Sequence, residues 1–129
     1  MLTRRVFFST ASAVFLIATP ALASEPAPFT GSAFEAAQKE GRPILIEIAA
    51  SWCPTCRAQE PIIKELLGSE RFKDMVAFRV DFDSQKDVVR SFGAQTQSTL
   101  IVFAGSEEKG RSVGDTDPAT IEKLLSQGL

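Results

Sequence analysis

The feature that most constrains this chain is the segment Trp52-Cys53-Pro54-Thr55-Cys56-Arg57, which holds the only two cysteines among 129 residues. A short apolar run, residues 44–49, precedes the segment, and a helical pattern begins at Pro54. The run predicts a buried central strand, and proline at a first helical position is well tolerated because its missing N–H costs little there. We therefore expect the cysteines at a strand-to-helix junction.

The expected position of Cys53 predicts a reactive thiol. At a helix N-terminus, unpaired backbone N–H groups and the positive end of the macrodipole favour the thiolate, which is the nucleophilic form. Cys56 lies one turn further along, close enough to attack a mixed disulfide on Cys53. The pair therefore predicts thiol–disulfide exchange in which Cys53 attacks and Cys56 resolves.

A purely structural disulfide is the alternative interpretation of the pair. Closing so short a ring contributes only about 2 kcal/mol, against nearly 5 kcal/mol for a loop of a hundred residues. So small a contribution does little for a domain that is long enough to build its own core. The redox interpretation is favoured for that reason.

The remaining pattern predicts a single α/β domain with a mixed sheet and helices on both faces. Ser32 is a plausible N-cap for the first helix, and Pro61 should kink the helix that follows the cysteines. The expected elements are helices at 32–40, 54–67, 83–92 and 118–127, strands at 44–49, 75–81, 99–103 and 110–113, and a hairpin turn at 105–110.

Composition excludes several classes of function. The formal net charge is −2 and no basic block is present, which argues against nucleic acid as a partner. The chain has no histidine, so a Cys-His hydrolase and the usual imidazole metal sites are excluded. We predict no cofactor and no metal site. Two alternatives stay open: a copper-handling protein that uses the two thiolates, and a redox-silent adaptor.

The N-terminal segment predicts export. Arg4 and Arg5 precede an apolar stretch, and Ala21-Leu22-Ala23 is a small-x-small cleavage site. We expect residues 1–23 to be a signal peptide cleaved after Ala23, residues 24–31 a linker, and residues 32–129 the domain. A periplasmic location follows, with no membrane span after cleavage. An uncleaved anchor is the alternative, and the paired arginines leave open twin-arginine export.

Beyond the cysteines, the chain resembles the thioredoxin family from about Phe34 to Leu125. Glu47, six residues before Cys53, matches the buried carboxylate of the family, and Pro61 matches its helix-kinking proline. Further matches in the right order are Phe92-Gly93, Thr99-Leu100-Ile101-Val102-Phe103 and Val113-Gly114. The resemblance implies the thioredoxin-like fold and a protein-disulfide oxidoreductase.

The resemblance also implies roles for single residues. Glu47 would accept a proton from Cys56, through water, when Cys56 attacks. Arg79 in the next strand is a candidate counter-charge for Glu47, whereas an outward-facing Glu47 at a sheet edge is the alternative. Trp52 is expected as a lid that shapes the partner surface, or else as a partly exposed packing residue. The full set expected to contact substrate is Trp52, Pro54, Thr55, Gln97, Ser98 and Thr99.

Ser98 departs from the family pattern. The family places a cis-proline at this position, beside the attacking cysteine, and its neighbours offer backbone groups to a bound peptide. A cis Gln97–Ser98 bond would cost about 2.5–4 kcal/mol, so we expect a trans bond. A trans bond would redirect the loop 95–98 and weaken strand-like docking of extended peptides. The Ser98 hydroxyl could also donate a hydrogen bond to the Cys53 thiolate and so favour the reduced form.

The Cys-Pro-Thr-Cys sequence after Trp52 resembles the membrane-tethered thioredoxins that reduce apocytochrome c. This resemblance favours a periplasmic reductant over a general oxidant. The expected partners are protein dithiols or disulfides and an upstream redox protein that returns electrons, and the protein is expected to be a monomer.

Overall fold

A computed structural model describes residues 25–129 of the chain. The predicted signal peptide, residues 1–23, lies outside the described residues. The strands are β1 (Ala27–Pro28), β2 (Pro43–Ala49), β3 (Val76–Asp81), β4 (Thr99–Ala104) and β5 (Glu107–Val113). They form one sheet in the order β1-β3-β2-β4-β5. The central strand β2 runs parallel to β3 and antiparallel to β4, so the sheet is mixed.

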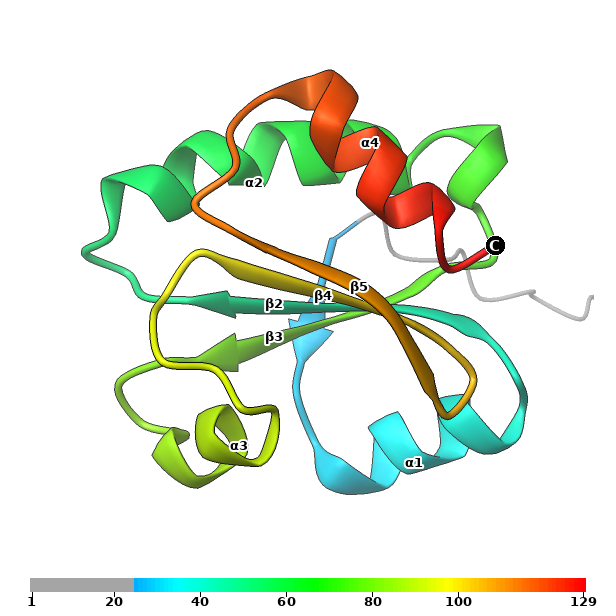
Figure 1. Ribbon diagram of the computed structural model, residues 1–129, viewed down its shortest axis with the longest axis horizontal. Coiled ribbons are helices and arrows are strands. Elements are labelled where there is room, and N and C mark those ends of the chain that lie inside the picture. The colour runs from blue at the N-terminus through cyan, green and yellow to red at the C-terminus, as the bar shows by residue number, and fades with distance from the viewer. Residues whose placement is uncertain (1–24) are drawn as a thin grey trace, which may run out of the picture.

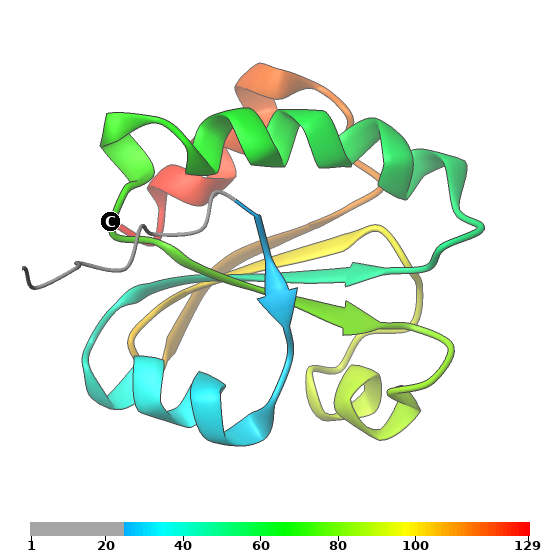
Figure 2. The same ribbon diagram turned by 180° about the vertical axis from the view of Figure 1, so that it is seen from behind.

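Helices cover both faces of the sheet, as Figures 1 and 2 show from opposite sides. Helices α2 (Pro54–Leu67) and α4 (Pro118–Ser126) lie over one face, together with a short 3₁₀ turn, η1 (Glu70–Phe72). Helices α1 (Gly31–Lys39) and α3 (Lys86–Ser91) lie under the other. The predicted fold class, a mixed sheet between two helical layers, is confirmed.

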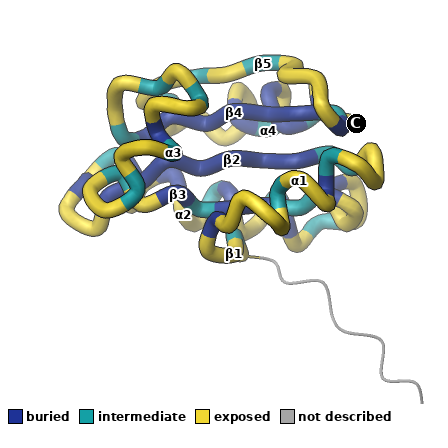
Figure 3. Tube along the Cα trace, turned by 90° about the horizontal axis from the view of Figure 1, so that it is seen from below, coloured by how far each residue is buried: buried dark blue, intermediate teal, exposed yellow. Residues whose placement is uncertain are grey.

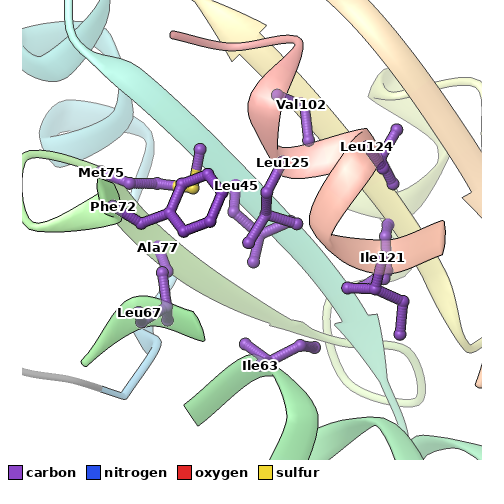
Figure 4. Close-up of a cluster of buried hydrophobic side chains, with 11 residues drawn as sticks. Leu45, Ile63, Leu67, Phe72, Met75, Ala77, Val102, Ile121, Leu124 and Leu125 are labelled. Carbon is purple, nitrogen blue, oxygen red and sulfur yellow. The ribbon is translucent and has the colours of Figure 1, made fainter. Parts of the chain in front are cut away.

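Alternation along β2 divides its side chains between two cores, since successive residues of a strand point to opposite faces. Ile44, Ile46 and Ile48 pack on the α1 and α3 side. Leu45 packs on the other side, within a cluster of side chains from α2, α4 and the sheet (Figure 4). By the same alternation Glu47 points towards α2. Figure 3 shows that β2 and β4 are buried along most of their length.

The expected elements around the cysteines agree closely with the structure. Helix α2 has the predicted bounds, and β2 and α4 differ from expectation by one residue each. Pro61 lies inside α2, as predicted. No helix within residues 25–129 combines the length and the apolar character needed to cross a bilayer.

Two predictions for the segment before α1 were wrong. Residues 24–31 were expected as a linker, but Ala27 and Pro28 form β1, which pairs in parallel with β3. Phe29 is buried in the core between the sheet and α1. The N-cap of α1 is Thr30 rather than Ser32, because the Thr30 hydroxyl accepts a hydrogen bond from the Ala33 N–H. The folded domain therefore includes residues that the sequence pattern assigned to the linker.

The predicted starts of two other elements, a helix and a strand, were also wrong. Helix α3 begins at Lys86 rather than at residue 83, because the Asp81 carboxylate accepts hydrogen bonds from the N–H groups of Asp83 and Ser84 and holds these residues in a turn. Strand β5 begins at Glu107 rather than at residue 110, so the hairpin turn is shorter than expected. Gly105, with φ of 58°, supplies the left-handed residue that this tight turn needs.

Candidate active site

Cys53 is the N-cap of α2, at the end of the sheet where β2 leads into the helix (Figure 1). Its backbone is extended, and its sulfur accepts a hydrogen bond from the Cys56 N–H at 3.1 Å. A sulfur thus occupies the place of the serine or aspartate oxygen that usually caps a helix. The capping role directs the Cys53 sulfur towards the unpaired N–H groups of the first helical turn.

The two cysteines are both reduced and buried, at 2% and 0% exposure for Cys53 and Cys56. The Cys56 thiol donates to the Cys53 sulfur. Burial raises the pKa of Cys53, but hydrogen bonds from Cys56, from Ser98 and from backbone N–H groups outweigh it, and the net pKa is lowered. Burial raises the pKa of Cys56, and its hydrogen bond to Cys53 raises it further. Cys53 is therefore the thiol that ionises first.

Ser98, the residue before β4, lies against both sulfurs. Its Oγ is 3.1 Å from the Cys53 sulfur and 3.1 Å from the Cys56 sulfur. A hydroxyl carries a single hydrogen, so it donates to one of the two sulfurs at a time. This contact agrees with the expectation that Ser98 supports the Cys53 thiolate.

The predicted trans bond before Ser98 is confirmed, since no peptide bond within residues 25–129 is cis. Ser98 instead adopts a left-handed backbone conformation with φ of 61°, and no other described non-glycine residue has a positive φ. Its carbonyl accepts a hydrogen bond from the Gly114 N–H at 2.9 Å. The main chain at residue 98 is thus turned inward and engaged with the adjoining loop.

Glu47 is buried at 1% exposure, which excludes the alternative of an outward-facing carboxylate. The predicted counter-charge is present, because Arg79 Nη2 donates to Glu47 Oε1 at 3.0 Å. The same nitrogen donates to Glu60 Oε1 of α2 at 2.7 Å. Burial raises the pKa of Glu47, and the hydrogen bond from Arg79 offsets part of that rise.

A cavity of about 400 Å³ opens beside Glu47. Its lining includes Pro61 and Ile63 of α2 together with the Arg79 and Glu60 side chains. The ion pair between Lys64 and Glu25, 2.8 Å long, belongs to the same lining. A space of this size and polarity can hold several water molecules, each of which occupies about 30 Å³. The buried carboxylate therefore has a polar opening on the α2 side.

The residues expected to contact substrate differ in accessibility. Trp52 and Pro54 are exposed, and the Trp52 indole N–H donates to Asp83 at 2.7 Å. Thr55 and Gln97 are half-buried. Thr99 is buried and its hydroxyl donates to the Thr96 carbonyl, so this side chain serves the loop rather than the surface.

Sequence reasoning missed Gln59, a fully buried polar residue three positions after Cys56. Its Nε2 donates to the Asp115 carbonyl at 2.8 Å and, at 3.4 Å, to the Ser98 carbonyl. The spacing could have revealed it, because residues i and i+3 share one face of a helix. Glu60, which shares Arg79 with Glu47, was missed as well.

The thioredoxin family model matches residues 25–127. The chain belongs to the thioredoxin family. Thioredoxin H2-1 of Oryza sativa subsp. japonica is 36% identical over 83 residues, which are 64% of this chain and 58% of that relative's length. Thioredoxin H-type of Brassica campestris is 34% identical over 91 residues, covering 70% of this chain and 72% of the relative.

Among solved structures, Trxlp from Edwardsiella tarda EIB202 is similar to this chain with a TM-score of 0.76 and 36% identity, over 78% of this chain and 98% of that one. The resemblance read from the sequence is therefore confirmed, and Cys53 and Cys56 lie where thioredoxins carry their redox pair. Within residues 25–129 no three His, Cys, Asp or Glu side chains gather as a metal site would require.

Proposed function

We propose that the protein is a thiol–disulfide oxidoreductase that reduces disulfides with the Cys53 and Cys56 thiols. The observation that carries this proposal is the pairing of a capping sulfur, Cys53, whose pKa is lowered, with a second thiol in direct contact behind it. A structural disulfide has no need of a thiol whose pKa is lowered. The family membership supports the same chemistry.

The reaction proceeds in two exchanges. The Cys53 thiolate attacks one sulfur of the substrate disulfide, forming a mixed disulfide and releasing the other substrate sulfur as a thiolate. Cys56 then loses its proton and attacks the Cys53 sulfur, which releases the second substrate thiolate. Two electrons pass to the substrate and the protein is left with a Cys53–Cys56 disulfide. A dithiol partner upstream returns the electrons by the reverse exchange.

Glu47 is the proposed acceptor of the Cys56 proton. Burial raises its pKa and so makes it a stronger base than an exposed carboxylate, and the polar cavity beside it offers a route by which the proton can leave. Substituting Glu47→Gln would slow release of the mixed disulfide while leaving its formation by Cys53 intact. Rapid-mixing measurements of the two steps separate these effects.

The loop at Ser98 bears on the class of substrate. Extended peptides dock on this family through backbone groups beside the residue at position 98, but here Ser98 has a left-handed backbone that redirects its neighbours, and its carbonyl accepts from Gly114. The exposed surface at Cys53 is instead made by the Trp52 and Pro54 side chains. Small disulfides, or a folded partner that brings its own complementary surface, fit this site better than an extended chain.

The proposal also includes where the protein acts, in the periplasm, and the direction in which it transfers electrons, to the substrate. Arg4, Arg5, the apolar stretch and the cleavage pattern ending at Ala23 support export to the periplasm. The resemblance of Cys-Pro-Thr-Cys to exported reductants supports the reducing direction. N-terminal sequencing of the protein from a periplasmic fraction tests export: Ser24 as first residue is expected, and an intact Met1 in the membrane fraction would contradict it.

The central test is covalent trapping. The Cys56→Ser variant should accumulate mixed disulfides, because the resolving thiol is gone. The matched Cys53→Ser variant should trap almost nothing, because Cys56 lies one helical turn behind position 53 and its pKa is raised. Equal trapping by both variants would refute the assignment of roles, and no trapping by either would refute the proposed activity. Copper binding by the reduced pair without disulfide exchange would favour the copper-handling alternative.

A further inference from the structure

Gln59 is a polar side chain with 0% exposure in the helix that carries the cysteines. Its position, three residues after Cys56, places it on the inner face of α2, directly behind the redox pair. An aliphatic side chain would fill such a position without any polar group to satisfy. The presence of the Gln59 amide in the interior therefore calls for a reason beyond packing.

The hydrogen bonds of Gln59 define its orientation. Nε2 faces two carbonyl oxygens, those of Asp115 and Ser98, so the amide cannot be reversed without setting oxygen against oxygen. Within residues 25–129 no donor reaches Oε1, which is also buried. The side chain thus directs its N–H groups to the carbonyls of the two loops, and a buried amide is satisfied through such hydrogen bonds.

Those two loops meet at Ser98. The Gly114 N–H donates to the Ser98 carbonyl, and Gln59 adds the second, longer hydrogen bond to the same oxygen. Ser98 also has the left-handed backbone, which non-glycine residues adopt only when neighbouring contacts hold them. In that conformation its hydroxyl lies 3.1 Å from both sulfurs.

We propose that Gln59 is a positioning residue that, through the Ser98 and Asp115 carbonyls, holds the Ser98 hydroxyl between the two reactive sulfurs. The inference rests on the proposed thiol–disulfide chemistry and adds to it the element that aligns the hydroxyl donor. Gln59 acts on the sulfurs only through Ser98. Its removal therefore has the same chemical consequence as removal of that hydroxyl.

The test is a double-mutant cycle on Gln59 and Ser98, read out on the thiols themselves. The purified full chain is titrated by thiolate absorbance, and the rate of Cys53 alkylation is measured below its pKa. Ser98→Ala should lower the alkylation rate roughly tenfold, the effect of losing one hydrogen bond to a charged sulfur. Gln59→Met, which keeps the volume but removes the amide, should lower it in the same direction. The double variant should match Ser98→Ala alone.

Gln85→Met is the matched control. Gln85 also ties backbone segments together through its amide, since its Nε2 donates to the Phe29 carbonyl and its Oε1 accepts from the Asp81 N–H, but it contacts neither sulfur. Its substitution should leave the alkylation rate unchanged. Where Gln59→Met fails to fold, Gln59→Asn replaces it, since the shorter amide stays polar but cannot reach both loops.

An unchanged alkylation rate in a folded Gln59 variant would overturn the proposal. So would a double variant in which the two effects simply add. The readout needs no substrate, so it is independent of the trapping experiment. Loss of trapping would refute the redox function, whereas an additive cycle would refute only the role of Gln59.

Discussion

Burial raises the pKa of both Cys53 and Cys56, and hydrogen bonding makes the two pKa values differ. Both sulfurs lose water, which favours the neutral form. Cys53 receives hydrogen bonds from the helix terminus, from Cys56 and from Ser98, and its pKa falls. Cys56 gives its hydrogen bond to Cys53, and its pKa rises. One thiolate beside one thiol is the arrangement that an attack followed by a resolution requires.

Two substitutions of Ser98 distinguish the effect of its hydroxyl on Cys53 from the effect of its backbone conformation on stability. Ser98→Ala and Ser98→Gly both remove the hydroxyl, so both should slow Cys53 alkylation to the same extent. Only glycine relieves the left-handed strain, so the glycine variant should be more stable than the alanine variant by about 1 kcal/mol in urea unfolding. Ser98→Pro should destabilise the fold unless the loop is rebuilt, because proline holds φ near −65°. Equal stability of the alanine and glycine variants would contradict the observed conformation.

A second prediction concerns Glu47 and pH. The pKa of Glu47 is raised in the folded protein, from a reference value of 4.5. Its contribution to stability is therefore fully present below about pH 4.5 and is lost as pH rises through the folded pKa. Glu47→Gln cannot ionise, so its stability relative to the native protein should increase from pH 4 to pH 8. Each unit of pKa shift corresponds to about 1.4 kcal/mol.

Urea unfolding at several pH values checks the Glu47 prediction. Glu60→Gln is the matched control, since Glu60 also bonds to Arg79 but is half-exposed. A pH-independent difference for Glu47→Gln would mean that the folded and unfolded pKa values coincide.

At the scale of elements, periodicity predicted those segments whose burial follows a regular pattern. The apolar run of β2 and the Ile62, Ile63, Leu66 and Leu67 stripe of α2 define both elements and the junction between them. β1 could not be predicted, because two residues that pair only through their backbone leave no side-chain pattern. The start of α3 was missed because a single carboxylate, Asp81, decides it.

The hydrogen bonds of Asp81 in this turn predict a pH-dependent contribution to stability. Hydrogen bonds from the backbone, chiefly the Ser84 N–H, lower the pKa of Asp81, so its contribution is present above the unfolded pKa of 3.8 and is lost as pH falls through the folded value. Asp81→Ala should destabilise the protein by roughly 1 kcal/mol at pH 7, as the loss of a helix cap does. The effect should become smaller as pH falls below 3.8.

Asp87→Ala provides the control for Asp81. Asp87 is exposed and makes only a surface ion pair with Arg90, so its substitution should change the unfolding free energy little. Urea titrations of both variants at pH 7 and pH 3 make the comparison. A loss of stability at Asp81→Ala that persists unchanged in acid would contradict the proposed hydrogen-bonding role.

For the whole molecule, the sequence predicted the architecture and the redox pair, since the motif, its helix and the flanking strand all point to one fold. Arg79 could be named as a candidate counter-charge because it lies in the strand after Glu47, and the structure places the two residues directly opposite each other on β2 and β3. The Gln59 contact with Ser98 could not be derived in the same way. It depends on how a loop without regular structure folds back onto α2, and no periodicity encodes that path.

The direction of electron transfer is a property of the whole domain, because the reduction potential and the relative stability of the two redox states are linked. A reductant is a protein whose fold favours the disulfide over the dithiol. One effect favours the disulfide here: the ring closure in the unfolded chain, worth about 2 kcal/mol. The stabilised Cys53 thiolate of the reduced protein acts against it.

We expect the ring-closure effect to prevail, so the oxidised protein should resist urea more than the reduced protein, by at most about 2 kcal/mol. Unfolding each state under matched conditions, with the Cys53→Ser/Cys56→Ser double variant as the redox-insensitive control, makes the measurement. Ser98→Ala should widen the gap, since it removes a hydrogen bond that stabilises the reduced state only. A reduced protein more stable than the oxidised one would identify the domain as an oxidant and reverse the proposed direction of transfer.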